Sequence, residues 1–367
     1  MANRYPPVHY HNYLQLDKLL DCQKPKSLEL GKESHDETLF IIVHQTYELW
    51  FKQLLHELTS VTGILDQNHV AETDMGLVVH RLHRMGEILK LLIDQIAVLE
   101  TMTPLDFLDF RELLFPASGF QSFQFRKLET CLGLTEKQRL LYNAKPYTAA
   151  LTAEQAKVLK SLESGSTLLR SVERWLERTP FLNVAGFDFW TNYRDAVQAM
   201  LNRDRDVVLA NDSLGLEDKE RNLKIIDAAG ASFRTLFDET LFDQARENGN
   251  WRMSLRALHA ALFIQVYRDQ PVLQQPFRLL TAIIDLDELL TNWRYRHALM
   301  AKRMLGSKIG TGGSSGFDYL RAATDQHRIF QDFSQLTTYF IPRSALPELP
   351  KSVEIELGFY YSTKRPT

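Results

Sequence analysis

Cysteine is scarce in this sequence, and both an excess of charge and long apolar runs are missing. Cys22 and Cys131 are the only cysteines among 367 residues, and neither belongs to a CxxC or CxxCH motif. This pattern gives little support to a cysteine-based zinc site or to covalently attached haem. Low cysteine content is typical of proteins in a reducing cytosol.

No apolar run approaches the roughly 18 residues that a membrane-spanning helix needs. The first residues, MANRYPPVHYHNY, lack the apolar core of a secretory signal peptide. A formal net charge of −3 and a pI of about 6.4 give no electrostatic argument for binding nucleic acid or an anionic membrane. We therefore expect a soluble cytoplasmic protein with no nucleic acid and no membrane among its partners.

Apolar residues recur at helical spacing along most of the chain, whereas the alternation typical of strands is rare. The main helices are predicted at 34–58, 73–100, 184–204, 215–240, 255–267 and 277–305. The predicted class is all-α with at most a short hairpin. We expect one domain over 1–367, in which the more charged region 132–180 forms a peripheral helical insertion.

The stretch from Ser34 to Leu58 reads SHDETLFIIVHQTYELWFKQLLHEL and predicts the central helix of the fold. Ser34 and Glu37 have the spacing of a capping box at its start. Apolar residues follow on almost every side, which is typical of a buried helix.

His44 falls on an aromatic face of this helix, four residues after Phe40 and before Tyr47 and Phe51. One interpretation is a core histidine whose ring nitrogens are satisfied by neighbours. The other is a neutral imidazole at the floor of an apolar pocket, where it accepts a hydrogen bond from a ligand. The stretch by itself leaves both interpretations open.

The predicted helix at 277–305 carries a second histidine among large apolar side chains. One of its faces contains Leu286, Leu290, Trp293, His297, Met300 and Met304. His297 is either a packed core residue or the axial ligand of a non-covalently bound haem iron. In the second case, its other ring nitrogen is expected to be fixed by a hydrogen-bond acceptor.

Arg111 ends a largely apolar segment just before the PASG turn at 116–119. It is either a structural residue paired with Asp106 or Asp109, or a contact for a ligand. Its planar guanidinium group is suited to gripping a carboxylate through two parallel hydrogen bonds.

The run GTGGSSG at 310–316 contains four glycines and three hydroxyl residues, among them Thr311. It has no following lysine and matches neither the phosphate-loop nor the dinucleotide spacing, so a nucleotide site is weakly supported. The composition is typical of a loop that moves as a lid or forms a static turn, with hydroxyl groups available for hydrogen bonding.

Several long segments resemble one enzyme family, the tryptophan 2,3-dioxygenases. The segments are SHDETLFIIVHQTYELWFKQ, LDFLDFRELLFPASGFQSFQFR, WRYRHALMAKRMLG and KIGTGGSSGFDYLR. Their order and intervals also match, and the resemblance extends from near Tyr10 to near Pro342. Phe123 and Phe317 stand where other side chains are common in the family, and neither removes an expected contact.

The resemblance implies a role for each of the residues singled out above. His297 matches the proximal ligand of a b-type haem, the iron-containing cofactor, with Trp293 packed against it. His44 matches the distal histidine that meets the indole N–H, and Phe40 lines the same pocket. Arg111 matches the residue that pairs with the substrate carboxylate.

Further positions match residues around the substrate. Phe107, Leu114 and Ser118 match neighbours on the distal side, with Ser118 expected to contact both substrate and haem. Thr311 matches a loop residue that helps hold the substrate ammonium group. Tyr10 and Tyr13 match residues that enter the pocket of an adjacent subunit, so the implied assembly is a homotetramer built as a dimer of dimers, with N-terminal segments exchanged between subunits.

The implied reaction cleaves the indole 2,3-bond of L-tryptophan with O2 and gives N-formyl-L-kynurenine, the first step of tryptophan catabolism by the kynurenine pathway. A haem-dependent monooxygenase of the same superfamily, acting on a modified indole, is one alternative. A non-catalytic helical interaction protein is the other, and it makes no use of His44, Arg111 and Thr311.

Overall fold

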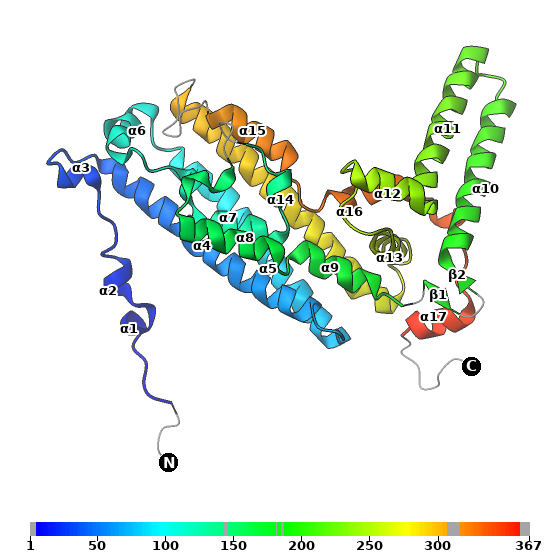
Figure 1. The fold of residues 1–367 in the computed structure, drawn as a ribbon, viewed down its shortest axis with the longest axis horizontal. Coiled ribbons are helices and arrows are strands. Elements are labelled where there is room, and N and C mark those ends of the chain that lie inside the picture. Colours follow the sequence, from blue (N-terminus) through cyan, green and yellow to red (C-terminus); the bar gives the residue numbers. More distant parts are fainter. Residues whose placement is uncertain (1–4, 142–145, 181, 185–186, 307–315, 360–367) are drawn as a thin grey trace.

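The computed structural model describes residues 5–141, 146–180, 182–184, 187–306 and 316–359 of the chain. These residues are mainly helical, which confirms the predicted all-α class (Figure 1). The strands that they contain are two short ones, β1 (Asn183–Val184) and β2 (Phe187–Asp188), paired antiparallel as the predicted short hairpin.

The long helices are α4 (His35–Leu65), α5 (Glu72–Leu99), α10 (Phe189–Ala210), α11 (Leu216–Phe237) and α14 (Gln274–Leu305). The shorter α-helices are α1 (Tyr10–Leu14), α2 (Leu16–Leu19), α3 (Lys26–Glu29), α6 (Pro104–Arg111), α7 (Phe123–Leu132), α8 (Ala153–Ser164), α9 (Leu168–Glu177), α12 (Glu239–Glu247), α13 (Leu255–Val266), α15 (Gly316–Gln326), α16 (Gln331–Gln335) and α17 (Lys351–Leu357). The 3-10 turns are η1 (Glu112–Leu114), η2 (Gly119–Gln121), η3 (Glu136–Gln138), η4 (Tyr147–Ala150), η5 (Pro271–Leu273), η6 (Leu336–Tyr339) and η7 (Arg343–Ala345).

Helices α4, α5 and α14 form the centre of the fold (Figure 1). Helix α5 packs against both α4 and α14, while α7 and α15 pack on the outer sides of α4 and α14. The contact between these helices is dry and apolar, and Leu54, Leu82, Leu92 and Leu286 are each at most 1% exposed. Burial of these side chains stabilises the arrangement because apolar area is removed from water.

A second group of helices extends the core away from this centre. Helix α9 packs against α4 and α13, and α10 and α11 form an antiparallel hairpin that projects from the body (Figure 1). Leu168, Val172 and Leu176 of α9 are fully buried. The single domain over 1–367, with 132–180 as an insertion, remains a prediction.

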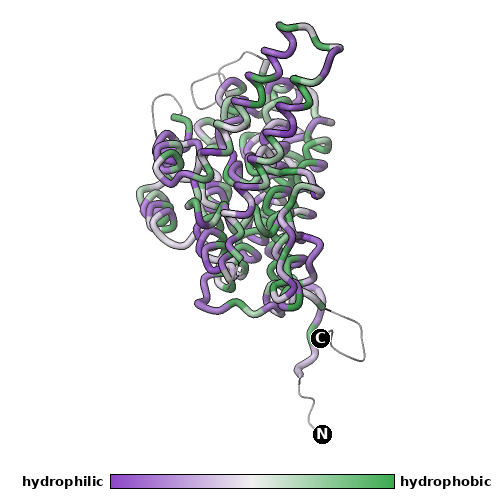
Figure 2. Tube along the Cα trace, turned by 90° about the vertical axis from the view of Figure 1, so that its right-hand side faces the viewer, coloured by the Kyte–Doolittle hydropathy of each residue, from purple (hydrophilic) through white to green (hydrophobic). Residues whose placement is uncertain are grey.

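The N-terminal segment leaves the body in both views (Figures 1 and 2). It carries α1 and α2, and neither helix contains a buried residue. Tyr10 is 72% exposed and Tyr13 is 74% exposed. In the single chain, this segment therefore presents two large aromatic rings to solvent.

The start of α4 differs from the prediction. Ser34 is the N-cap residue, but its side chain makes no capping hydrogen bond, so the predicted capping box is wrong. Glu37 is instead buried, and its carboxylate accepts from the backbone N–H groups of Lys26 and Ser27 at 2.8 and 2.9 Å. The Glu37 side chain thus binds the first turn of α3, whereas the local pattern predicted that it would cap its own helix.

Two other boundaries shift for local reasons. Helix α14 begins at Gln274, before Pro276, because proline is tolerated in the first turn of a helix, where its missing N–H has no partner to lose. Helix α10 begins at Phe189, after the β hairpin, with the Asp188 carboxylate capping the Trp190 N–H at 3.2 Å. Within the described ranges, no helix is long and apolar enough to cross a membrane.

Candidate functional site

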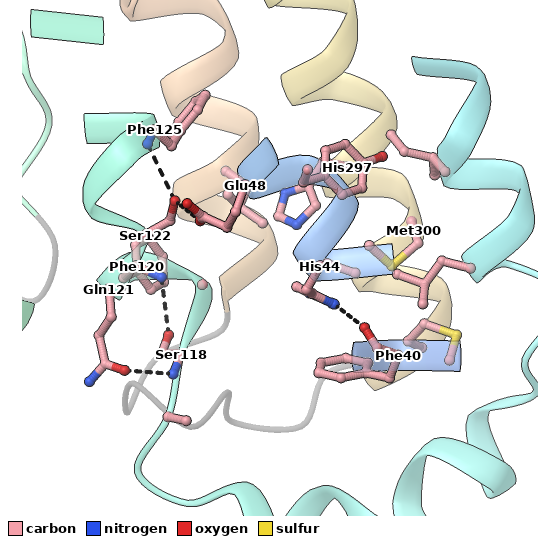
Figure 3. A pocket seen from close by; sticks show the side chains of 18 of the residues that line it. Phe40, His44, Glu48, Ser118, Phe120, Gln121, Ser122, Phe125, His297 and Met300 are labelled. Atoms are coloured by element: carbon pink, nitrogen blue, oxygen red, sulfur yellow. Dashed lines mark hydrogen bonds between the residues drawn. The ribbon is translucent and has the colours of Figure 1, made fainter. Parts of the chain in front are cut away.

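A large cavity of about 750 Å3 lies between α4, α6, α7, α14 and α15 (Figure 3). Its volume falls within the range typical of small-molecule and cofactor sites. The walls are mainly apolar and aromatic, with a few polar groups placed among them. Of the residues to which the resemblance gives a role, those that line it are Phe40, His44, Phe107, Arg111, Leu114, Ser118, Trp293 and His297.

His44 faces this cavity with a defined tautomer. Its Nδ1 lies 2.7 Å from the carbonyl oxygen of Phe40, one turn earlier on α4 (Figure 3). Because a carbonyl oxygen only accepts, Nδ1 must carry the proton, and Nε2 keeps its lone pair. Burial lowers the pKa of His44, against the opposing effects of the Phe40 hydrogen bond and the Glu48 carboxylate. His44 is thus a neutral hydrogen-bond acceptor in the wall.

His297 lies on α14 and faces the same cavity (Figure 3). Burial, together with a smaller effect of the nearby His44, lowers its pKa to about 4, so the imidazole is neutral at pH 7. Its ring is parallel to that of Trp293, at an interplanar angle of 7° and a centroid distance of 5.4 Å. Within the described part of the chain no hydrogen bond to the His297 ring is found, so the acceptor expected to fix it is not seen.

Aromatic rings surround the end of the cavity near Phe40. The Phe40 ring lies 4.1 Å from that of His44 and 5.7 Å from that of Phe107, measured between centroids. Phe110 is fully buried beneath both phenylalanines and meets them edge to face. Arg111 follows Phe110 directly and also lines the cavity.

The PASG turn forms another wall of the cavity. Ser118 caps the 3-10 turn η2, and its Oγ accepts from the Phe120 N–H at 3.4 Å (Figure 3). Asp106, one of the two acids considered for Arg111, caps its own helix, with its carboxylate accepting from the Thr103 N–H at 2.9 Å.

The structure does not bring every expected residue to the cavity. Tyr10 and Tyr13 lie on the N-terminal segment, away from the cavity of their own chain. Thr311 lies outside the described residues. In the single chain, neither tyrosine lines the cavity.

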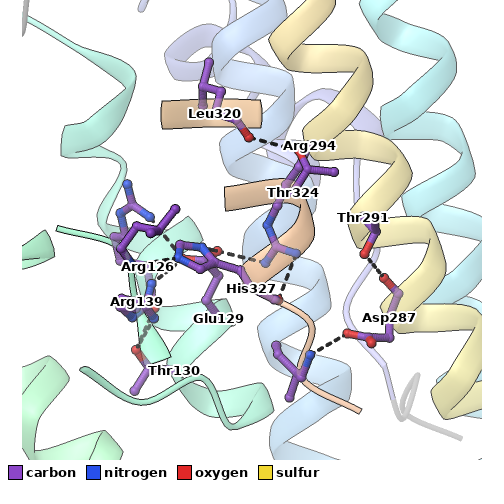
Figure 4. Close-up of polar contacts among 12 residues, drawn as sticks. Arg126, Glu129, Thr130, Arg139, Asp287, Thr291, Arg294, Leu320, Thr324 and His327 are labelled. Atoms are coloured by element: carbon purple, nitrogen blue, oxygen red, sulfur yellow. Dashed lines mark hydrogen bonds and ion pairs between the residues drawn. The ribbon is translucent and has the colours of Figure 1, made fainter. Parts of the chain in front are cut away.

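A buried ionic cluster lines the far side of the cavity (Figure 4). Glu129 is 1% exposed, and it pairs with Arg126 at 3.1 Å, with Arg294 at 2.9 Å and with Arg139. These cations hold the pKa of Glu129 well below its usual value, although burial opposes them. Burial lowers the pKa of His327, the other neighbour, to about 4, so that it is neutral.

The charge of this cluster is not balanced. Among the described residues, the ion pairs of this cluster join three guanidinium groups to one carboxylate beside a neutral imidazole, which leaves two positive charges in excess. The Nε atoms of Arg126, Arg139 and Arg294 are buried, and no hydrogen-bond partner for them is found among the described residues. Uncompensated buried charge is unfavourable, so this wall is suited to an anionic group of a ligand.

Sequence reasoning missed several polar residues of the cavity. Glu48 lies one turn after His44 on the same helix, and Arg294 directly follows Trp293. Both residues lie next to residues that the sequence analysis had singled out, and this closeness could have indicated them. Arg126 and Glu129 form an i,i+3 ion pair within α7, and this spacing was their only local signal, because the other partners of Glu129, Arg139 and Arg294, come from outside α7.

The fold and the cavity together define a class: a helical protein enclosing a largely apolar ligand site that two neutral histidines face from two different helices. A sequence model of tryptophan 2,3-dioxygenase matches residues 4–340 of the chain. The chain belongs to the tryptophan 2,3-dioxygenase family.

Curated relatives agree with this assignment. The tryptophan 2,3-dioxygenase of Bdellovibrio bacteriovorus is 54% identical over 98% of this chain and 100% of its own length. That of Alteromonas mediterranea is 47% identical, over 98% of this chain and 99% of its own. That of Dictyostelium discoideum is 45% identical, over 97% of this chain and 89% of its own.

Proposed function

We propose that the protein is a haem-dependent dioxygenase that cleaves the indole 2,3-bond of L-tryptophan with O2 and gives N-formyl-L-kynurenine, the first step of tryptophan catabolism by the kynurenine pathway. The observation that carries the proposal is that His44 and His297 face one apolar cavity in a chain of this family. The sequence-based expectation of a cytoplasmic location stays part of the proposal.

The cavity fits a b-type haem in two respects. His297 offers a neutral imidazole for which no hydrogen-bond partner is found among the described residues, as an iron ligand requires, and Trp293 packs against its ring. The cluster around Glu129 has two positive charges in excess, which would suit the two carboxylates of haem b. His297, Trp293, Arg126 and Arg294 would therefore hold the cofactor, with Ser118 beside it.

When bound, the haem iron would supply the site at which dioxygen is activated. The residues of the chain would bind and orient the amino acid. An indole nitrogen only donates, and the neutral His44 keeps a lone pair on Nε2 to accept from it. Arg111 would hold the substrate carboxylate, and these two anchors together would fix the ring against the oxidant.

The apolar walls would exclude water from the site. Phe40 and Phe107 line the cavity next to His44, and Leu114 extends the same wall. A dry site strengthens the polar contacts of the substrate and protects reactive species from hydrolysis.

The remaining contacts would come from elements that the single described chain does not bring together. Thr311 would help hold the substrate ammonium group. Tyr10 and Tyr13 would enter the cavity of an adjacent subunit, within a homotetramer built as a dimer of dimers. The exposure of both rings on a segment that leaves the body supports this exchange.

The reaction is tested by reconstituting the protein with haem anaerobically and then adding L-tryptophan and O2. Formyl-kynurenine is followed by its absorbance, and the product mass is measured. A gain of two oxygen atoms from one O2 molecule is expected. A gain of one atom would indicate the monooxygenase, and no spectral change with haem or tryptophan would support a non-catalytic protein.

Replacing His44 by alanine should weaken tryptophan binding and turnover while leaving haem bound. The variant loses one buried hydrogen bond to the substrate, which corresponds to a loss of about tenfold in affinity. Tryptophan titration under anaerobic conditions measures the first effect, and haem content per chain measures the second. If the variant lost its haem completely, the assignment of His44 to the substrate would be wrong.

A further inference from the structure

Glu48 is a carboxylate in a cavity wall that is otherwise largely apolar. It lies one turn after His44 on α4 and lines the same cavity (Figure 3). Among the described residues, no lysine or arginine lies within ion-pair distance of it, in contrast to Glu129 on the neighbouring helix. The presence of Glu48 in this wall is therefore not explained by an ion pair.

Two neutral donors, both from the start of α7, meet this carboxylate. The Ser122 hydroxyl donates to Oε1 at 2.5 Å, and the Gln124 side-chain amide donates to Oε2 at 3.1 Å. The same amide also donates to the backbone carbonyl oxygen of Glu48 at 2.8 Å. Three hydrogen bonds therefore join Glu48 of α4 to the start of α7.

Ser122 is also the N-cap of α7, because its Oγ accepts from the Phe125 N–H at 3.3 Å. On the other side, its backbone N–H donates to the Gly119 carbonyl oxygen at 3.1 Å. The Ser118 N–H in turn donates to Gln121 Oε1 at 3.1 Å (Figure 3). The segment 118–122 is therefore a hydrogen-bonded turn, and hydrogen bonds to Glu48 attach it to α4.

The choice of glutamate over glutamine follows from this geometry. A carboxylate has two acceptor oxygens and receives both donors at once, whereas an amide has one acceptor oxygen, so the Ser122 hydroxyl would have to turn and accept from its NH2 group. Phe120 and Phe125, which flank Ser122, also line the cavity. A shift of Ser122 would thus move the serine and aromatic wall opposite His44.

We propose that Glu48 is a positioning residue, which fixes the 118–122 wall of the cavity against helix α4 and so sets the space available to the substrate beside His44. The part that concerns substrate rests on the proposed function. The anchoring part does not, because it follows from hydrogen bonds within the chain.

The test compares E48A and E48Q with the native protein and with E220Q, a matched control on the exposed face of α11. Backbone hydrogen exchange of peptides covering 118–126 reports the anchor directly, and it needs neither haem nor activity. KM and kcat for tryptophan are then measured on the haem-loaded protein. E48Q conserves the shape of the side chain, so it keeps the test valid if E48A fails to fold.

Backbone hydrogen exchange in 118–126 is expected to be faster in E48A than in the native protein. The KM for tryptophan should rise about tenfold with a smaller change in kcat, because the displaced wall weakens substrate binding. E48Q should lie between E48A and the native protein because it retains one acceptor, and E220Q should match the native protein. Native exchange in both Glu48 variants would overturn the anchor, and fast exchange with native KM would overturn its effect on substrate. Absence of turnover in the native protein would count against the proposed function alone, since exchange still tests the anchor.

Discussion

Replacing His297 by alanine is expected to remove most of the bound haem, lowering its content per chain by at least about tenfold, and to abolish the spectrum of the ferrous protein. The axial bond would be lost outright, since the described cavity wall has no other histidine on α14. The His297 imidazole is neutral and can therefore ligate iron, whereas the methyl group of alanine cannot. Haem content is measured by absorbance after purification.

Two comparisons make this result specific. His44→Ala, on the opposite helix, should keep its haem, because that ring is assigned to the substrate. Added imidazole should restore part of the haem binding to His297→Ala by occupying the space that the side chain leaves. A His297→Ala protein with native haem content and a native ferrous spectrum would remove His297 from the axial role.

Arg111→Ala should lose tryptophan affinity by roughly 30-fold to several thousand-fold, the equivalent of about 2 to 5 kcal/mol for the loss of one partner from a buried charge pair. The physical reason is that the substrate carboxylate would enter a cavity end formed by Phe40, Phe107 and Phe110 with no cation to receive it. Anaerobic titration of the haem-loaded protein with tryptophan measures the effect.

A substrate analogue provides the control for Arg111. Tryptamine lacks the carboxylate, so its affinity should be nearly the same for Arg111→Ala and the native protein. Arg111→Lys keeps the positive charge but loses the planar guanidinium group. Its tryptophan affinity should therefore lie between those of Arg111→Ala and the native protein. Tryptophan affinity within threefold of native in Arg111→Ala would show that the guanidinium group does not hold the carboxylate.

Local patterns predicted the helical elements well and their ends less well. The long helix at 73–100 appears as α5 (Glu72–Leu99), since its apolar spacing is regular and no other element competes for it. The capping box at Ser34 was wrong because Glu37 is taken up by the backbone of α3, a contact between segments that a local pattern does not contain. Such tertiary competition is the usual limit of reasoning from short windows.

For the candidate site, too, local patterns predicted some features, and others required the tertiary structure. The sequence placed Phe40 and His44 on one helical face and Trp293 and His297 on another, because helical spacing alone decides which side chains share a face. It did not bring the two faces together without the resemblance to a family. Helices α4 and α14 both pack against α5, and residues of both line the cavity, an arrangement that requires the whole fold.

The sequence by itself determined the helical class, the two histidine faces and, through its long matching segments, the family. Only the tertiary structure decided the protonation and the surroundings of these groups. Burial keeps both histidines neutral, and the Phe40 carbonyl leaves the lone pair of His44 on Nε2. Helices distant in sequence build the unbalanced charge around Glu129, because its partners include Arg294, 165 positions away along the chain. A charge and its solvation depend on what surrounds them in space, which no local stretch of sequence contains.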